Sequence, residues 1–139
     1  MDTQIEKVQE LLNRVVDAKA GFEVMVDKAE PEFRPVPLKF RETHHQHIQR
    51  ISAIITAMGG DADDSGSLFA TVNRTVVSLR SLVDEIDADV MHRVREGEDH
   101  VIEAFDEAIN ALNGSRHRDE LIEMRGEIQS LLTETAGTR

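Results

Sequence analysis

The chain has 139 residues, no cysteine, tryptophan or tyrosine, and a formal net charge of −11. The acidic charge excludes the basic face that nucleic acids and anionic membranes require, and the lack of cysteine excludes disulfides, thiolate zinc sites and cysteine nucleophiles. The length predicts a single domain over residues 1–139. No signal peptide and no apolar run of the ~18 residues needed for a membrane span is visible, so we expect a cytoplasmic protein.

The N-terminal region is predicted to form a long helix over residues 3–29, because its apolar residues recur at steps of three and four. All three prolines follow within residues 31–37, which predicts a hairpin corner. A second helix is predicted over residues 36–58, and the pair Gly59-Gly60 ends it. The apolar stripe of this second helix consists of Phe40, His44, Ile48, Ile51, Ile55 and Met58.

The second half of the chain repeats the arrangement of two long helices. A short helix is predicted over residues 68–83, followed by a long helix over 88–112 and another that follows Ser115 and runs to about Thr133. We therefore predict an all-α fold. It is a ferritin-like four-helix bundle, with two helical hairpins joined by a long crossover that carries the short helix.

Three of the six histidines fall in residues 42–50 (ETHHQHIQR) of the second helix. At about 100° per residue, His44 lies within the apolar stripe and His47 at its edge, whereas Glu42 points away from the core. Glu98 lies within the stripe of the helix predicted over residues 88–112. These positions predict polar side chains inside the bundle.

The heights of these side chains along the bundle can also be compared. If the helix over residues 88–112 runs parallel to the second helix, Glu98 falls level with His44. Counting from the hairpin corner places Glu23 and Lys19 of the first helix near the same level. The sequence therefore predicts one polar cluster, and the last helix offers mostly Ile128 and Leu131 at this level, flanked by Glu127 and Gln129.

Four interpretations of this cluster remain open. A di-iron site of the bundle type needs two Glu-x-x-His motifs, and only residues 42–45 match that motif. A mononuclear site for a divalent iron, manganese or zinc ion would use His44, His47 and Glu98, with Glu23 as a further ligand. The third interpretation is a structural cluster in which Glu98 pairs with Lys19 or an imidazole. The fourth is a different register that leaves these groups half exposed.

Three segments carry a resemblance to a known family. Residues 17–22 (DAKAGF) are similar to Asp-Gly-x-x-Gly-Phe, residues 58–67 (MGGDADDSGS) to Leu-Gly-Gly-x-Pro-x-x-x-Gly-Ser, and residues 95–99 (REGED) to Arg-Gly-Glu-Asp with one residue inserted. Together they resemble a bacterial family of ferritin-like four-helix-bundle proteins classed as a domain of unknown function. The resemblance implies the ferritin-like fold and a bacterial source, and it carries no established activity. The histidines of residues 42–50 depart from the family pattern.

These observations predict a structural or protein-interaction module that forms a homodimer. We expect the contact on the short helix or on apolar residues outside the stripes, namely Val24, Met25, Ile102 and Ile109. The sequence contains no Gly-rich phosphate loop and no nucleophile elbow, so we expect no conventional enzyme and no catalytic residue. The alternative function is a metal-binding protein in storage or stress response.

Overall fold

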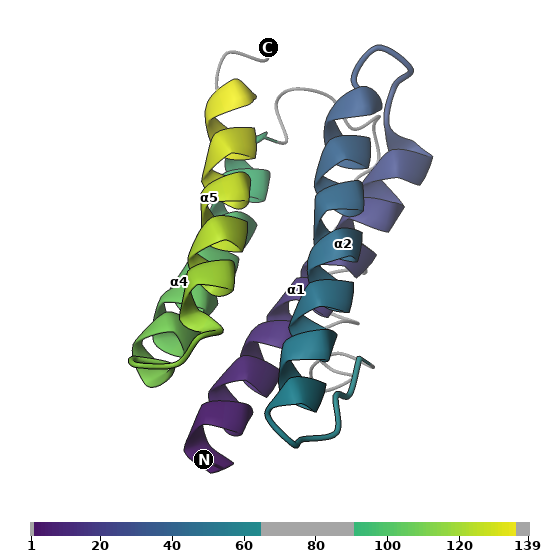
Figure 1. The fold of residues 1–139 in the computed structure, drawn as a ribbon. Coiled ribbons are helices and arrows are strands. Elements are labelled where there is room, and N and C mark those ends of the chain that lie inside the picture. The colour runs from purple at the N-terminus through teal and green to yellow at the C-terminus, as the bar shows by residue number, and fades with distance from the viewer. Residues whose placement is uncertain (1, 65–90, 136–139) are drawn as a thin grey trace.

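The computed structural model describes residues 2–64 and 91–135. The described part contains four helices: α1 (Asp2–Lys28), α2 (Pro35–Ala57), α4 (Met91–Ala111) and α5 (Arg118–Glu134). They form an all-α four-helix bundle (Figure 1), and their bounds lie close to those predicted from the apolar periodicity. The predicted short helix over residues 68–83, and with it the crossover, lies outside the described residues.

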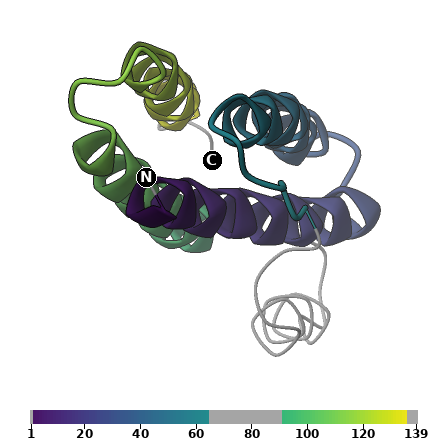
Figure 2. The ribbon, with the colours of Figure 1, turned by 60° about the horizontal axis from the view of Figure 1, so that its bottom comes forward.

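The four helices occupy the corners of a square (Figure 2). Helix α1 packs against α2 and α4, and α5 packs against α4 and α2, so α2 and α4 lie at diagonal corners. The side-chain amide of Gln4 at the start of α1 donates to the carbonyl of Ala111 at the end of α4, at 3.0 Å. Helix α1 is therefore antiparallel to both α2 and α4, and α2 and α4 run in the same direction, as the height comparison assumed.

The hairpin corner between α1 and α2 is closed by the side chain of Arg34. Its guanidinium donates to the carbonyls of Val26 and Ala29, at 3.2 and 2.9 Å. Val26 lies in the last turn of α1 and Ala29 directly follows the helix, where carbonyls have no intrahelical amide to accept from. Pro35 then occupies the first turn of α2, where the missing N–H costs nothing. The proline-rich segment therefore forms the predicted hairpin corner. The guanidinium of Arg34 supplies hydrogen bonds to the end of α1 that the prolines, which have no N–H, cannot donate.

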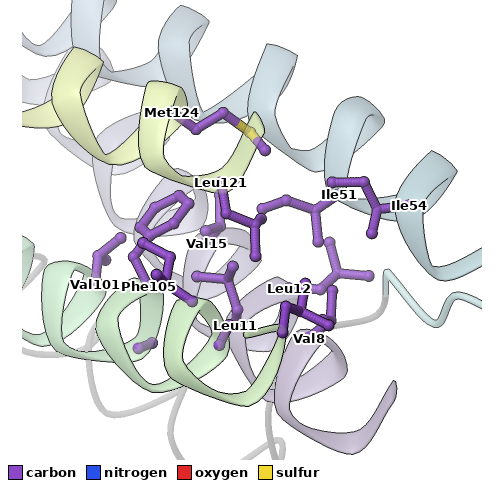
Figure 3. Packing of buried hydrophobic residues seen from close by; sticks show 14 of the residues in the cluster. Val8, Leu11, Leu12, Val15, Ile51, Ile54, Val101, Phe105, Leu121 and Met124 are labelled. Atoms are coloured by element: carbon purple, nitrogen blue, oxygen red, sulfur yellow. The ribbon is translucent and has the colours of Figure 1, made fainter. Parts of the chain in front are cut away.

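The core consists of two hydrophobic clusters stacked along the bundle axis. The larger lies toward the start of α1 and the end of α4, and Figure 3 shows Leu11, Leu12 and Phe105 within it. The smaller lies toward the hairpin corner and contains Phe22, Phe40, Met91 and Leu131 among others. Because both clusters draw on α1 and α4, the residues between the clusters sit at mid-height in the bundle.

Two of the four residues predicted to form an exposed contact surface belong to the interior. Met25 and Ile109 are buried, whereas Val24 and Ile102 are partly buried against the two clusters and keep some exposure. The prediction was wrong for Met25 and Ile109 because it assumed that each helix buries only one narrow apolar stripe. A bundle helix that touches two neighbours buries a wider arc of its surface. Ile122 of α5 is the one large hydrophobic residue among those described that is exposed, at 41%.

No helix among the described residues is both long enough and apolar enough to cross a membrane.

Candidate functional site: a buried histidine–carboxylate cluster

The centre of the bundle holds a histidine and a carboxylate that face each other across its diagonal. Nε2 of His44 on α2 lies 3.0 Å from Oε1 and 2.9 Å from Oε2 of Glu98 on α4. The side chain of His44 is 0% exposed and that of Glu98 is 1% exposed. The backbones of α2 and α4 do not touch, so these two side chains bridge the core between them. The predicted pairing of Glu98 with an imidazole is therefore what the structure contains.

A second histidine–carboxylate pair joins α2 to α5. Nε2 of His47 lies 2.6 Å from Oε1 of Glu127, and the imidazole is fully buried while the carboxylate is 41% exposed. The other oxygen of Glu127 lies 3.4 Å from the guanidinium of Arg50, which also contacts Glu120 and Glu123 at 3.2 and 2.9 Å. His47 thus connects the interior to a row of ion pairs on the surface between α2 and α5.

Sequence reasoning placed Glu127 beside the cluster but did not include it among the site residues. Its position, one residue before the buried Ile128, suggested a flank of the apolar face of α5. The missing signal was the spacing of Glu120, Glu123 and Glu127, which puts three carboxylates on one side of the helix. Arg50, three residues after His47 on α2, offers the matching positive charge.

Aromatic rings surround the two imidazoles above and below. Phe22 stacks on Phe40 with ring centroids 4.9 Å apart, and on His44 with centroids 5.5 Å apart. His44 and His47 meet edge to face at 6.3 Å, and His47 meets Phe105 in the same way at 6.0 Å. Since Phe22 belongs to the smaller core cluster and Phe105 to the larger, the histidines form a polar layer between the two clusters.

These hydrogen bonds define which nitrogen of each imidazole carries the hydrogen and which carries the lone pair. An ionised carboxylate only accepts hydrogen bonds, so the Nε2 atoms that face Glu98 and Glu127 carry the hydrogen. In a neutral ring the lone pair is then on Nδ1. The Nδ1 atoms of His44 and His47 are both buried, and neither has a hydrogen-bond partner among residues 2–64 and 91–135. Unpartnered buried polar atoms of this kind are rare in folded proteins and mark a site that needs an explanation.

Burial controls the protonation of His47. Removal from water lowers the pKa of this imidazole below its usual value, and the nearby His44 and Arg50 act in the same direction. The hydrogen bond that His47 donates to Glu127 opposes the shift without reversing it. The neutral form of His47 is therefore favoured in the folded protein.

Glu23, predicted as a further metal ligand, does not join the cluster. Its side chain is 53% exposed and lies 3.6 Å from Nζ of Lys19. Both residues line an open polar hollow of about 280 Å³ together with Arg41, Glu42 and His45. Because Lys19 pairs with Glu23 in this hollow, the predicted pairing of Lys19 with Glu98 is replaced by the pairing of His44 with Glu98. Within residues 2–64 and 91–135, no group of three or more His, Asp or Glu side chains is arranged to hold a metal ion.

The remaining histidines lie away from the cluster. His45, His92 and His100 are exposed, and His117 is half-buried at the start of α5. Glu42 of the Glu-x-x-His motif is also exposed and pairs with Arg41 at 3.2 Å. The motif therefore contributes one buried side chain, His44, and no carboxylate to the interior.

Comparison with protein families places the chain. A family model described as "Domain of unknown function (DUF2383)" matches residues 3–111. The chain belongs to this family. Comparisons with curated proteins and with solved structures give no match. The DUF2383 match spans α1, α2 and α4, so it includes His44, His47 and Glu98 and ends before α5 and Glu127.

The diagonal pair predicts a strong coupling between two substitutions in this DUF2383 protein. We expect His44→Leu to lower the free energy of unfolding by about 3–5 kcal/mol, because it leaves the Glu98 carboxylate buried without its donor. The double variant His44→Leu/Glu98→Leu should be more stable than either single variant, since apolar side chains of similar size then fill the layer. Urea unfolding of all four proteins measures the coupling.

The matched control for this double-mutant cycle is His45→Leu, which changes the neighbouring exposed histidine and should leave the free energy of unfolding almost unchanged. Simple addition of the two single effects in the double variant would contradict a direct buried interaction.

The lowered pKa of His47 predicts a pH dependence of stability. The unfolded chain, in which this imidazole has its usual pKa of about 6.5, binds the proton more readily than the folded chain. Acidification through pH ~6.5 toward the lower folded pKa should therefore reduce the free energy of unfolding, and the contribution is fully present above pH ~6.5. His47→Gln keeps a donor for Glu127 but does not titrate, so it should flatten this part of the profile.

Urea unfolding at closely spaced pH values between 5 and 8 makes the measurement, with His45→Gln as the exposed control. An equally steep profile in His47→Gln and the parent protein would assign the dependence to other groups.

Proposed function

We propose that this DUF2383 chain is a structural or protein-interaction module of ferritin-like architecture, and not a conventional enzyme. The observation that supports this proposal is the closure of the polar layer. His44 and Glu98 are sealed from solvent and bonded to each other through Nε2 of the imidazole, so a substrate molecule cannot touch them. A buried pair of this kind serves to fix which helices face each other and at what height. The working surface of the module is then its exterior.

The partner that we propose is a second copy of the chain. A protein with a net charge of −11 repels its own copies over most of its surface, so self-association needs a locally neutral contact. Ile122 provides an exposed apolar side chain on α5. Its neighbours one turn away on the helix are Arg118, Asp119, Arg125 and Gly126, which carry both signs of charge. Ile122 is therefore the described residue on which we centre the contact.

This proposal predicts a dimer at micromolar concentration, measured by size-exclusion chromatography with light scattering. Ile122→Glu should shift the dimer toward monomer by at least about tenfold in dissociation constant, because a buried contact residue at an interface centre typically contributes more than 1 kcal/mol. Gln129→Glu, which adds the same charge at an exposed position of α5, is the control.

A monomer at all tested concentrations would contradict the homodimer. A dimer that persists unchanged in Ile122→Glu would retain the homodimer and move the contact away from this face of α5.

A second candidate function is metal binding by a ferritin-like protein in storage or stress response, with iron, manganese or zinc as the ion. The observation that favours it is the pair of unpartnered Nδ1 atoms in the core, since imidazole nitrogen is a common ligand of these metals. Protein purified without an affinity tag should then retain near-stoichiometric metal after incubation with Fe(II), Mn(II) or Zn(II) and desalting, measured by inductively coupled plasma mass spectrometry. Loss of this metal in His44→Ala but not in His45→Ala would support the candidate. Metal-free protein would leave the cluster as bundle architecture.

A further inference from the structure

The turn between α4 and α5 contains a dipeptide with a chemistry of its own. Asn113-Gly114 is the one Asn-Gly step in the chain. We propose that Asn113 is a site of spontaneous deamidation, in which the backbone nitrogen of Gly114 attacks Cγ of the Asn113 side chain. The isoaspartate that results lengthens the turn and loosens the attachment of α5 to the rest of the bundle.

The reaction needs no reagent other than water. The nitrogen of Gly114 forms a bond to Cγ of Asn113, its proton passes by way of water to the side-chain amino group, and that group leaves as ammonia. The product is a cyclic succinimide. Water then opens this ring at one of its two carbonyls, which leaves either aspartate or isoaspartate at position 113. In isoaspartate the main chain runs through Cβ and Cγ, so the backbone gains a methylene group.

The structure leaves both reacting groups accessible. Asn113 and Gly114 are exposed, and a carbon at the position of the missing Cβ of Gly114 would meet nothing within 4 Å. Among residues 2–64 and 91–135, neither the N–H of Gly114 nor the side chain of Asn113 forms a hydrogen bond. The φ of Gly114 is +88°, a value that favours glycine, and the missing side chain keeps the approach to its nitrogen open.

The other described asparagines lack this freedom. Asn110 is also exposed, but the residue after it is Ala111, the last residue of α4. The N–H of Ala111 donates to the carbonyl four residues back in the helix and is not free to attack a side chain. Asn13 lies inside α1, and its side chain accepts a hydrogen bond from Gln9 at 2.8 Å. The geometry therefore singles out Asn113.

The same turn determines where α5 begins. The N–H of Ser115 donates to the carbonyl of Leu112 at 2.8 Å, and this hydrogen bond spans the Asn113-Gly114 step. A methylene group inserted into the spanned backbone separates the two ends of the bond. Helix α5 carries Glu127, whose carboxylate lies 2.6 Å from Nε2 of His47. A displaced start of α5 therefore weakens the contact between α5 and the polar layer.

Peptide mapping by mass spectrometry tests the modification in the full chain. Trypsin releases residues 96–116 as one peptide, which contains both Asn110 and Asn113. During incubation at neutral pH, Asn113 should convert at least about tenfold faster than Asn110, which corresponds to about 1.4 kcal/mol in activation free energy. The rate should rise with pH, because the attacking nitrogen must lose its proton. Electron-transfer fragmentation distinguishes isoaspartate from aspartate in the product.

Two variants make the assignment to this step. Asn113→Gln should stop the conversion over the same incubation, because its longer side chain closes a larger ring slowly. Asn110→Gln is the matched control and should leave the conversion at Asn113 unchanged. An intact Asn113 throughout, or equal conversion of the two asparagines, would overturn the proposal.

Hydrogen exchange separates the effect of the longer backbone from that of the added charge. The aged protein, freed from unreacted chains by ion exchange, is compared with Asn113→Asp, which has the same composition and charge but a normal backbone. Amides of α5 should exchange faster in the aged protein, while those of α1 and α2 keep their rates. Equal exchange in the two proteins would overturn the loosening of α5. A monomer in light scattering would contradict the homodimer and leave the conversion of Asn113 unaffected.

Discussion

A carboxylate enclosed by four helices, as Glu98 is, needs a donor within reach, because an unpaired buried charge costs the fold about 3–5 kcal/mol. His44 is that donor, and it stands on the helix diagonally opposite. The pair can form only when Glu98 of α4 lies level with His44 of α2. A shift of α4 by one turn, about 5.4 Å, would separate the two side chains. The register of the second hairpin against the first therefore depends on this interaction.

The surface ion pairs between α2 and α5 cannot impose the same constraint. Arg50 contacts three carboxylates of α5, and Lys39 contacts Glu134 at 3.6 Å. Pairs of this kind contribute about 0.2–1 kcal/mol each and weaken as salt screens them. Arg50 also has alternative carboxylates within reach, so a small displacement of α5 exchanges one partner for another. The surface ion pairs support the contact between α2 and α5, whereas the buried pair of His44 and Glu98 selects one register of the helices.

The helices and the central pair could be predicted from the sequence, because both follow from periodicity. The step of 3.6 residues puts His44 and Glu98 inside their stripes, and equal distances from the helix starts put them at one height. Glu23 was misplaced because height alone does not tell on which side of the stripe a residue lies, and Lys19 one turn away attracts it outward. Met25 and Ile109 were misplaced because the arc that a helix buries depends on how many neighbours it has. The tautomers of the imidazoles depend on partners from α4 and α5, so no local pattern encodes them.

The sealed position of the polar layer limits what it can do. A substrate would have to separate two helices to reach His44, whereas the carboxylate of Glu127 is 41% exposed at the edge of the layer. A molecule that binds to the folded bundle would therefore meet its exterior. The DUF2383 match covers the helices that carry His44, His47 and Glu98 but not α5, which supplies Glu127 and the exposed Ile122. Glu127, which connects the interior to solvent, and Ile122, on which the proposed contact is centred, thus lie on the helix outside the matched region, while the pair that holds the bundle in register lies within it.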